Sequence, residues 1–360
     1  MRILHIVHID HLGNGIAVVV NELSKAQQKL NNEVMVVNFR TNSWDIDGFI
    51  KCNNLQEFLK IITNFKPEIA IIHGVFYTEI KSISKALVKL NIPYVIEPHG
   101  AYSRENYRKN TYKKWLFKKI YLNNVVRFSN GWIFLNDSER NNFALSHKKP
   151  IYIIPNGCSH HHTSIHKYLA KNKIQFLYIG RIAIHHKGLD LLIDAITQLD
   201  NNLCKNIEFK FYGPGTTSDI EKFKIMIKPL SNIITYHGPI FGKEKKEVIK
   251  NSDIFILTSR FEGFPMAILE AMSYGKPCLV STGTNVTNII NKYNCGWCIP
   301  NLTVSHIANA IKLSIDEYTR NSDTYAKNAI TASEEYDWKK IAEFSIEKYT
   351  DIIQSAMSIK

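Results

Sequence analysis

The sequence contains no apolar run of about 18 residues, so it predicts no transmembrane helix. Residues Met1–Val7 are too short and wrongly flanked for a signal peptide, and they are more typical of a buried strand. The six cysteines are scattered, which fits a reducing cytoplasm. The lone C-x-x-C pair, Cys295 and Cys298, lacks the further ligand pair of a zinc site, so we expect neither a metal nor a redox site there.

Acidic residues are also in the minority. Lys and Arg together number 45 against 32 for Asp and Glu, and the formal net charge is +13. Such a surplus indicates an anionic partner, which can be nucleic acid, a membrane surface or a phosphorylated ligand. Charge by itself does not choose among these classes, so the choice depends on motifs.

The chain has 360 residues, which exceeds the size of one ordinary core and suggests two domains. Short apolar strand signals alternate with helical ones, and the alternation restarts after the turn Asn156-Gly157. The expected strands are 3–8, 33–39, 69–73, 93–97, 131–136 and 151–154, then 174–179, 207–212, 233–237, 253–257 and 277–281. This alternation predicts two doubly wound α/β domains with parallel sheets.

Two glutamates, Glu262 and Glu270, are separated by seven residues after the expected strand 253–257. We expect a helix over Phe264–Tyr274 with Pro265 in its first turn, where a missing N–H costs nothing. Glu262 then lies beside free backbone N–H groups, which attract anions, and both carboxylates can accept hydrogen bonds from sugar hydroxyls. Two glutamates at this spacing also occur on solvated helix faces, but the embedded Gly-Phe-Pro and the final Glu-Ala make chance a poor explanation.

Arg181 and Lys187 lie between the expected strand 174–179 and a helix over 189–199. They are therefore expected at the carboxyl edge of the sheet, where α/β proteins bind ligands. A guanidinium fork and a compact ammonium both suit phosphate, although ordinary surface cations are the alternative. Glycine turns and one histidine follow other strands in the same way, at Gly13, Gly15, Gly213, Gly238 and His99.

Taken together, these motifs resemble retaining glycosyltransferase family 4, whose signature is E-x7-E and whose fold is GT-B. The resemblance runs from residue 1 to about Trp338, and its type is that of bacterial surface-polysaccharide enzymes. It implies two doubly wound Rossmann-like domains that face a central cleft. Residues 1–157 with a C-terminal helix over 338–360 would form the N-terminal, acceptor-side domain. Residues 158–337 would form the C-terminal domain that binds the nucleotide-sugar.

The resemblance implies a role for each motif residue. Arg181 and Lys187 would neutralise the leaving diphosphate, and His99 would orient the donor sugar. Glu262 would hold that sugar together with the N–H groups after it, and Glu270 would hold the ribose hydroxyls. The other implied donor-binding residues are Gly13, Gly15, Gly213, Gly238, Pro239, Gly263, Phe264 and Pro265. The glycine loop departs from the family pattern, because Asn14 separates two glycines that are usually adjacent.

We expect no metal and no cofactor, because cationic side chains and helix N-termini would balance the charge of the nucleotide-sugar, which is a substrate. Asp45-Ile46-Asp47 has the D-x-D form of a metal motif from the other major glycosyltransferase fold, but it is interpreted as a solvated loop. Four histidines at 160, 161, 162 and 166 are interpreted as part of a polar interdomain linker.

The strongest charge cluster is residues 104–121, with seven cations, one acid and five aromatics. Such a segment suits an anionic membrane surface, and it also suits nucleic acid or a solvated helix with its aromatics in the core. We expect membrane association and no nucleic acid.

The expected function is transfer of a sugar, with retention, from a nucleotide-sugar to an acceptor hydroxyl. UDP-sugars are the first choice of donor and GDP-mannose the second, and a lipid-linked oligosaccharide is the expected acceptor. The enzyme would be cytoplasmic and peripheral to the inner face of the membrane. An epimerase or a phosphorylase of the same fold fits the E-x7-E context less well. A non-catalytic nucleic-acid-binding protein, the alternative from another class, leaves the four charged motif residues unexplained.

Overall fold

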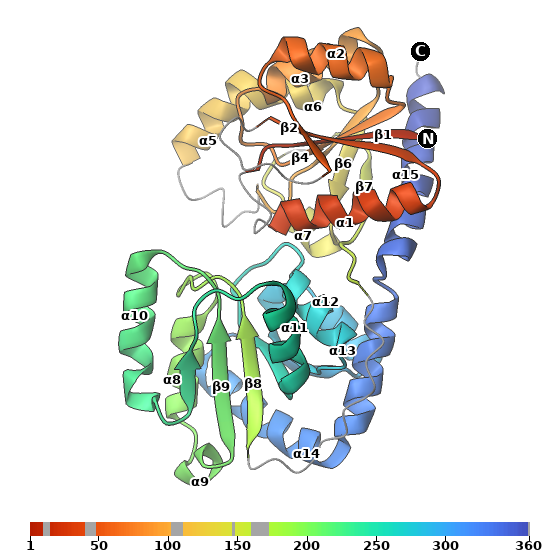
Figure 1. Cartoon of the computed structure of the whole chain (residues 1–360). Coiled ribbons are helices and arrows are strands. Elements are labelled where there is room, and N and C mark those ends of the chain that lie inside the picture. The colour runs from red at the N-terminus through yellow and green to blue at the C-terminus, as the bar shows by residue number, and fades with distance from the viewer. Residues whose placement is uncertain (10–14, 40–47, 102–110, 146–147, 160–172, 359–360) are drawn as a thin grey trace. The chain divides into compact units, whose positions relative to one another are not determined.

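A computed structural model describes residues 1–9, 15–39, 48–101, 111–145, 148–159 and 173–358. The chain divides into two compact units, one formed by residues 1–157 with 338–360 and the other by residues 158–337 (Figure 1). Each unit contains one all-parallel sheet with helices, so the prediction of two doubly wound α/β sheets is confirmed.

The sheet of the first unit has seven strands in the order β3-β2-β1-β4-β5-β6-β7. The strands are β1 Arg2–Val7, β2 Glu33–Asn38, β3 Phe49–Lys51, β4 Ile69–His73, β5 Tyr94–Glu97, β6 Gly131–Phe134 and β7 Ile151–Ile153. The helices are α1 Gly15–Lys29, α2 Leu55–Phe65, α3 Ile80–Lys89, α5 Thr111–Phe117, the π-helix η1 Lys118–Leu122, α6 Asn123–Phe128, α7 Asp137–Asn142 and α15 Trp338–Ser358.

Both faces of this sheet are covered, which explains why its central strands are apolar throughout. Leu4 and Ile6 of β1 belong to the larger core with α2 and α3, whereas Val7 belongs to a smaller core with Val20 of α1. Alternate residues of one strand point to opposite faces, so these two cores lie on the two sides of the sheet. The C-terminal helix α15 packs against α1 (Figure 1).

The sheet of the second unit has six strands in the order β10-β9-β8-β11-β12-β13. The strands are β8 Ile174–Ile179, β9 Ile207–Tyr212, β10 Ile234–Tyr236, β11 Ile254–Leu257, β12 Cys278–Ser281 and β13 Gly296–Ile299. The helices are α8 Leu189–Thr197, α9 Asn201–Cys204, α10 Thr217–Ile227, η2 Lys228–Leu230, α11 Gly242–Asn251, α12 Met266–Ser273, η3 Thr282–Thr284, α13 Thr287–Tyr293 and α14 Val304–Glu334.

Two short edge strands, β3 and β13, were not expected from the sequence. Strand β13 contains the C-x-x-C segment, and it pairs with β12 in register from Gly296 opposite Cys278. Gly296 has a φ of 155°, and a Cβ at this position would lie 2.0 Å from the carbonyl oxygen of Cys278. Cys295 and Cys298 are free thiols that contact the carbonyls of Ile290 and Thr287.

Candidate functional site

The candidate site of the second unit lies at the carboxyl edge of its sheet. Arg181 and Lys187 follow β8, and Glu262 follows β11. Strands β8 and β11 are neighbours in the sheet, so the loops that follow them emerge side by side. The strand order therefore brings together side chains that are 75 residues apart in the sequence.

Lys187 and Glu262 form an ion pair in which each side chain is only 12% exposed. The hydroxyl of Ser259 donates a hydrogen bond to the same carboxylate oxygen of Glu262. The loop of Lys187 is held against β11, since a Cβ on Gly188 would lie 2.1 Å from the carbonyl oxygen of Thr258. The expected phosphate-binding cation and the expected sugar-binding carboxylate are thus paired with each other.

Arg181 is exposed, and its Nη2 lies 3.2 Å from Nδ1 of His186. A guanidinium only donates, so His186 accepts at Nδ1 and donates from Nε2 to the carbonyl of Phe261, 2.8 Å away. The His186 ring also stacks on the Phe261 ring, with 4.0 Å between their centres. Burial lowers the pKa of His186. Sequence reasoning missed His186, because its partner lies on a distant loop.

The loop from Glu262 to α12 differs from the expectation. Pro265 is extended, with φ −78° and ψ 104°, and it precedes the helix, which begins at Met266. The prediction of Pro265 in the first helical turn was therefore wrong by one position. Asn285 donates to the carbonyl of Glu262 at 2.6 Å and holds this loop in place. The Phe264 side chain is buried and packs near Tyr336, so it stabilises the loop from inside.

Glu270 lies on α12 and forms an ion pair with Lys245 of α11, and both side chains are about one-quarter exposed. The sequence offered no signal for this pair, because Lys245 is one of several lysines on a polar helix. Each carboxylate of the E-x7-E motif is therefore paired with a lysine in this structure.

The glycine turns after β9 and β10 are joined directly. The N–H of Gly213 donates to the carbonyl of Gly238 at 2.8 Å, and the hydroxyl of Tyr236 donates to the carbonyl of Gly213 at 2.9 Å. Gly213 has a φ of 144°, and a Cβ there would lie 1.9 Å from the carbonyl oxygen of Gly180. Gly238 has a φ of 81° and open space around it, while Pro239 is exposed.

In the first unit, His99 follows β5 and has a φ of 50°, a strained value for a residue other than glycine. Its side chain is 7% exposed, and burial lowers its pKa to about 4. His99 Nε2 lies 3.0 Å from His73 Nδ1 and 3.5 Å from Glu97 Oε1. Among the described residues, His73, Glu97 and His99 are the group whose atoms could hold a metal ion.

Several expected positions are not described by the structure. Gly13 lies outside the described residues, as do Asp45, Asp47 and the histidines at 160, 161, 162 and 166. Gly15 is described and begins α1.

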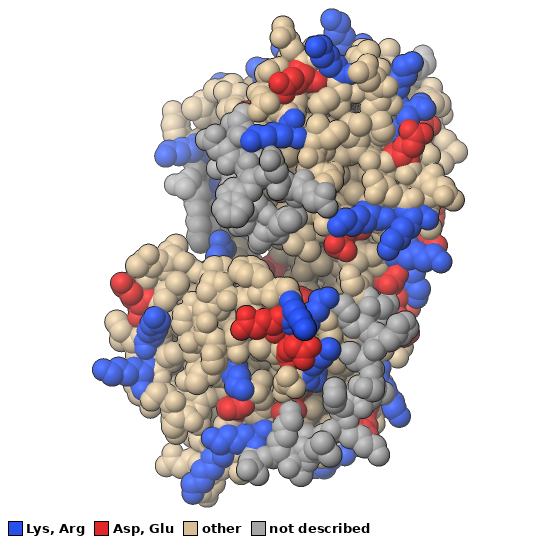
Figure 2. All heavy atoms as spheres, in the orientation of Figure 1, with Lys and Arg blue, Asp and Glu red and all other residues tan. Residues whose placement is uncertain are grey.

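The described part of the basic segment, residues 111–121, forms α5 and most of η1. Trp115 is 46% exposed and Tyr112 is 73% exposed. The ammonium of Lys119 lies 5.3 Å from the centre of the Trp115 ring, and that of Lys114 lies 5.5 Å from the ring of Phe76. Basic side chains also occur elsewhere on both units, on the face that Figure 2 shows. None of the helices in the described residues combines the length and the apolar character that a membrane-spanning helix needs.

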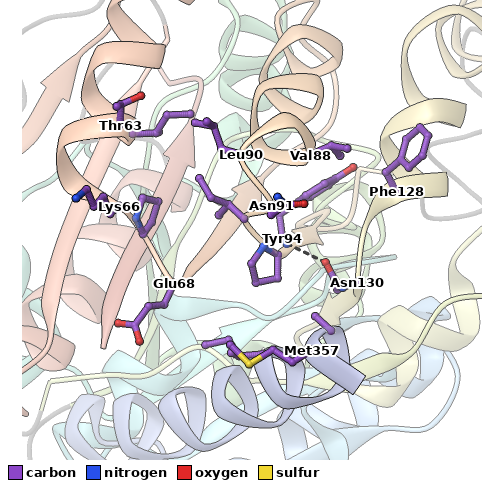
Figure 3. A pocket seen from close by; sticks show the side chains of 16 residues that line it. Thr63, Lys66, Glu68, Val88, Leu90, Asn91, Tyr94, Phe128, Asn130 and Met357 are labelled. Atoms are coloured by element: carbon purple, nitrogen blue, oxygen red, sulfur yellow. Dashed lines mark hydrogen bonds between the residues drawn. The ribbon is translucent and has the colours of Figure 1, made fainter. Parts of the chain in front are cut away.

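A cavity of about 560 Å³ lies in the first unit (Figure 3). It lies at the start of β5, whereas His99 follows the end of β5. It is lined by residues that precede β4 and β5, such as Pro67 and Pro93, and by Met357 near the end of α15. The cavity contains none of the residues expected to carry chemistry, so we do not assign it to the candidate site.

Parts of this chain are similar in sequence to known glycosyltransferases. Residues 163–332 match the family model described as Glycosyl transferases group 1. A lipopolysaccharide 1,6-galactosyltransferase of Salmonella typhimurium is 36% identical over 113 residues, which are 29% of this chain and 29% of that protein. An Escherichia coli UDP-Gal:alpha-D-GlcNAc-diphosphoundecaprenol alpha-1,3-galactosyltransferase is 27% identical over 157 residues, which are 42% of this chain and 39% of that protein. The chain thus spans less than half the length of these two relatives.

The structure of Anabaena HepE in complex with UDP is similar over the whole chain, with a TM-score of 0.75 at 17% identity. The similarity covers 98% of this chain and 100% of that one. Identity at this level shows the fold alone, and the fold is the one expected from the sequence. Residues 163–332 of this protein are therefore similar to Glycosyl transferases group 1, and the chain has the GT-B fold.

Proposed function

We propose that this protein is a retaining glycosyltransferase that moves a sugar from a nucleotide-sugar to an acceptor hydroxyl. The observation that carries the proposal is the cluster at the carboxyl edge of the second sheet. There, Arg181 and the Lys187–Glu262 pair lie on adjacent loops, and Glu262 precedes the amino end of α12. Cations, a carboxylate and helix N–H groups in one place suit a ligand that carries both phosphates and sugar hydroxyls.

In this proposal, the diphosphate of the donor draws Lys187 away from Glu262. Lys187 and Arg181 then neutralise the charge that grows on the diphosphate as its bond to the sugar breaks. The carboxylate of Glu262 then becomes free to accept hydrogen bonds from the sugar. Glu270 likewise leaves its ion pair with Lys245 and accepts hydrogen bonds from the ribose hydroxyls. The acceptor attacks on the face that the diphosphate leaves, and that diphosphate takes the acceptor proton, so no nucleophilic side chain is needed.

We infer that transfer needs no metal ion, because two cationic side chains and the amino end of α12 supply the positive charge that a diphosphate requires. UDP-sugars are the preferred donor class, with GDP-mannose as the alternative. This preference is supported by HepE, whose structure contains UDP, and by the galactosyltransferase relative whose name specifies UDP-Gal. A lipid-linked oligosaccharide of a surface polysaccharide is the proposed acceptor, in keeping with the two galactosyltransferase relatives.

The function is tested by supplying UDP-glucose, UDP-galactose or GDP-mannose with a lipid-linked acceptor and measuring the release of nucleoside diphosphate. Release that depends on both donor and acceptor supports the proposal. Salt-sensitive binding of RNA without release from any donor would favour the nucleic-acid-binding alternative.

Glu270→Ala is expected to weaken binding of the preferred nucleotide by about 1.5–3 kcal/mol, because the ribose hydroxyls lose a charged acceptor. Calorimetric titration of UDP and GDP into both proteins measures the difference. Asp316→Ala is a suitable control, since it removes a carboxylate from an exposed ion pair with Arg320 on α14. Equal nucleotide affinities of Glu270→Ala and wild type would exclude Glu270 from the ribose site.

We further propose that α5 and η1 bind an anionic membrane surface, which would place the enzyme at the inner face of the membrane. Lys113, Lys114, Lys118 and Lys119 lie on the same short helical stretch as the exposed rings of Tyr112 and Trp115. Lysines attract acidic headgroups and aromatic rings insert at the interface, so the two kinds of residue act together.

Changing these four lysines to Gln is expected to abolish co-sedimentation with vesicles that contain phosphatidylglycerol, while nucleotide binding stays intact. The lost attraction is up to about 1 kcal/mol for each lysine and fades as salt rises. The matched control changes four lysines of α2 and α3 to Gln, at positions 60, 81, 85 and 89, and lowers the net charge equally. Equal loss in both variants would show that net charge, rather than this surface, drives the binding.

A further inference from the structure

A buried chain of side-chain hydrogen bonds runs through the first unit from α15 to the end of β5. Ser345 Oγ lies 2.9 Å from Gln27 Nε2, and Gln27 Oε1 lies 2.9 Å from His5 Nε2. His5 Nδ1 lies 2.8 Å from His73 Nε2, and His73 Nδ1 lies 3.0 Å from His99 Nε2. The inner members of the chain are shielded from water, since Gln27, His5 and Ser345 are fully buried and His73 is 2% exposed.

The hydrogen bonds of Ser345 indicate the direction of this hydrogen-bond chain, and the buried Tyr349 hydroxyl lies beside both Ser345 and Gln27. The Ser345 hydroxyl donates to the carbonyl of Ala342 at 2.8 Å, so its oxygen is left to accept a hydrogen bond. The group of Gln27 that faces Ser345 is therefore its amide NH₂, and its carbonyl oxygen is turned toward His5. Because Gln27 Oε1 can only accept, His5 Nε2 carries the ring hydrogen and donates it to that oxygen.

The same reasoning determines the tautomers of the His5 and His73 rings. Burial lowers the pKa of both His5 and His73 to about 3, so each ring is neutral and carries one N–H. His5 therefore has a bare Nδ1, which accepts from His73 Nε2–H. His73 in turn has a bare Nδ1, which faces His99 Nε2.

The carboxyl group of Glu97 lies beside both His73 and His99. Its Oε2 lies 3.2 Å from the bare Nδ1 of His73, and its Oε1 lies 3.5 Å from His99 Nε2. Burial raises the pKa of Glu97. The hydrogen bond at His99 Nε2 is therefore the one with His73, whose bare Nδ1 requires that His99 Nε2 carries the hydrogen.

We propose that Gln27, His5 and His73 are positioning residues that fix His99 as its Nε2–H tautomer and leave Nδ1 as a hydrogen-bond acceptor. If the proposed function holds, this tautomer gives His99 a role in recognising the donor sugar. Its Nδ1 accepts a hydrogen bond from a hydroxyl of the donor sugar, so a donor that lacks that hydroxyl is discriminated against.

Long-range ¹H–¹⁵N spectra of histidine-labelled protein test the tautomer without any substrate. The His99 signals, identified by their loss in His99→Gln, are expected to show a protonated Nε2 and a bare Nδ1. Gln27→Met removes the acceptor opposite His5 Nε2. We therefore expect the donors and acceptors along the hydrogen-bond chain to exchange roles, so that His99 adopts its Nδ1–H tautomer. Ser24→Ala is the matched control, because Ser24 is a buried serine of α1 whose hydroxyl has no hydrogen-bond partner among the described residues. It should leave the His99 signals unchanged.

Should Gln27→Met fail to fold, Ser345→Ala serves the same purpose. It frees Gln27 to turn, and a mixture of both His99 tautomers is expected. An Nδ1–H tautomer or a doubly protonated His99 ring in wild type would overturn the proposal, as would spectra that Gln27→Met and Ser345→Ala both leave unchanged. A metal ion on His73 Nδ1 and His99 Nε2 would also overturn it, and metal analysis with spectra before and after EDTA detects that outcome.

Transfer kinetics then test the recognition role separately. In Gln27→Met, kcat/KM is expected to fall about fivefold, which corresponds to one hydrogen bond. If wild type transfers no sugar from any donor, the proposed function fails, yet the spectra still decide the tautomer.

Discussion

Arg181→Ala and Lys187→Ala are each expected to lower turnover by about 10²-fold or more, with a smaller effect on nucleoside binding. The diphosphate becomes more negative as its bond to the sugar breaks, so its attraction to both cations is greatest in the transition state. Arg181 is exposed and held only at its edge by His186, which leaves most of its guanidinium available to a ligand. Steady-state kinetics with the preferred donor measure kcat and KM for each variant.

A control is needed because Lys187→Ala also leaves Glu262 without its ion pair. Circular dichroism checks that the variant is folded, and Arg320→Ala removes an exposed cation of α14 in the same unit. That control should transfer sugar like wild type. Near-normal turnover in both Arg181→Ala and Lys187→Ala would contradict the assignment of these residues to the diphosphate.

Gly213→Ala is expected to lower the free energy of unfolding of the second unit by about 4 kcal/mol. Backbone strain at a positive φ contributes about 1–3 kcal/mol, and steric overlap contributes a similar amount. The overlap arises because a Cβ on Gly213 would lie 1.9 Å from the carbonyl oxygen of Gly180, a backbone atom that has no freedom to swing away. Urea denaturation followed by circular dichroism measures the loss.

Gly238→Ala is the matched control, since Gly238 also ends a strand and also has a positive φ. Among the residues that the structure describes, none beyond its chain neighbours has an atom within 4 Å of the Cβ that this variant would add, so the main effect is on the backbone conformation. The expected loss is about 1–2 kcal/mol. Equal losses in the two variants would show that the contact with Gly180 is unimportant for stability.

Much of the fold was predictable because the strands of a parallel sheet have an easily recognised sequence pattern. Strands such as Ile69–His73 and Ile174–Ile179 are buried on both faces, so they are continuous apolar runs with sharp ends. Strand β13 escaped prediction because its run of four residues is short, begins with Gly296 and is only half-buried at alternate positions, so its strand geometry depends on pairing with β12. Pro265 was placed one position too far into α12, since proline occurs both before a helix and in its first turn.

The positions of Arg181, Lys187 and Glu262 after strands can be recognised without a structure, and they imply that all three residues lie at one edge of a sheet. This is possible because strand ends are local features, and parallel strands all end at the same edge. The partners of these residues, in contrast, depend on how the elements pack. Glu262 pairs with Lys187 across 75 residues and Glu270 with Lys245 across 25, and both pairings depend on which elements become neighbours.

The same distinction separates the glycines and the histidines. Gly213 and Gly238 look alike as turns after strands, and only the contact of Gly213 with Gly180 makes one of them sterically irreplaceable. His5 and His73 are single polar residues at the ends or middles of apolar strands, with nothing local to connect them to His99. They form one chain because β1 and β4 are adjacent, and β4 and β5 are adjacent, in the folded sheet. A local pattern specifies an element, whereas a contact between elements exists only once the whole unit is packed.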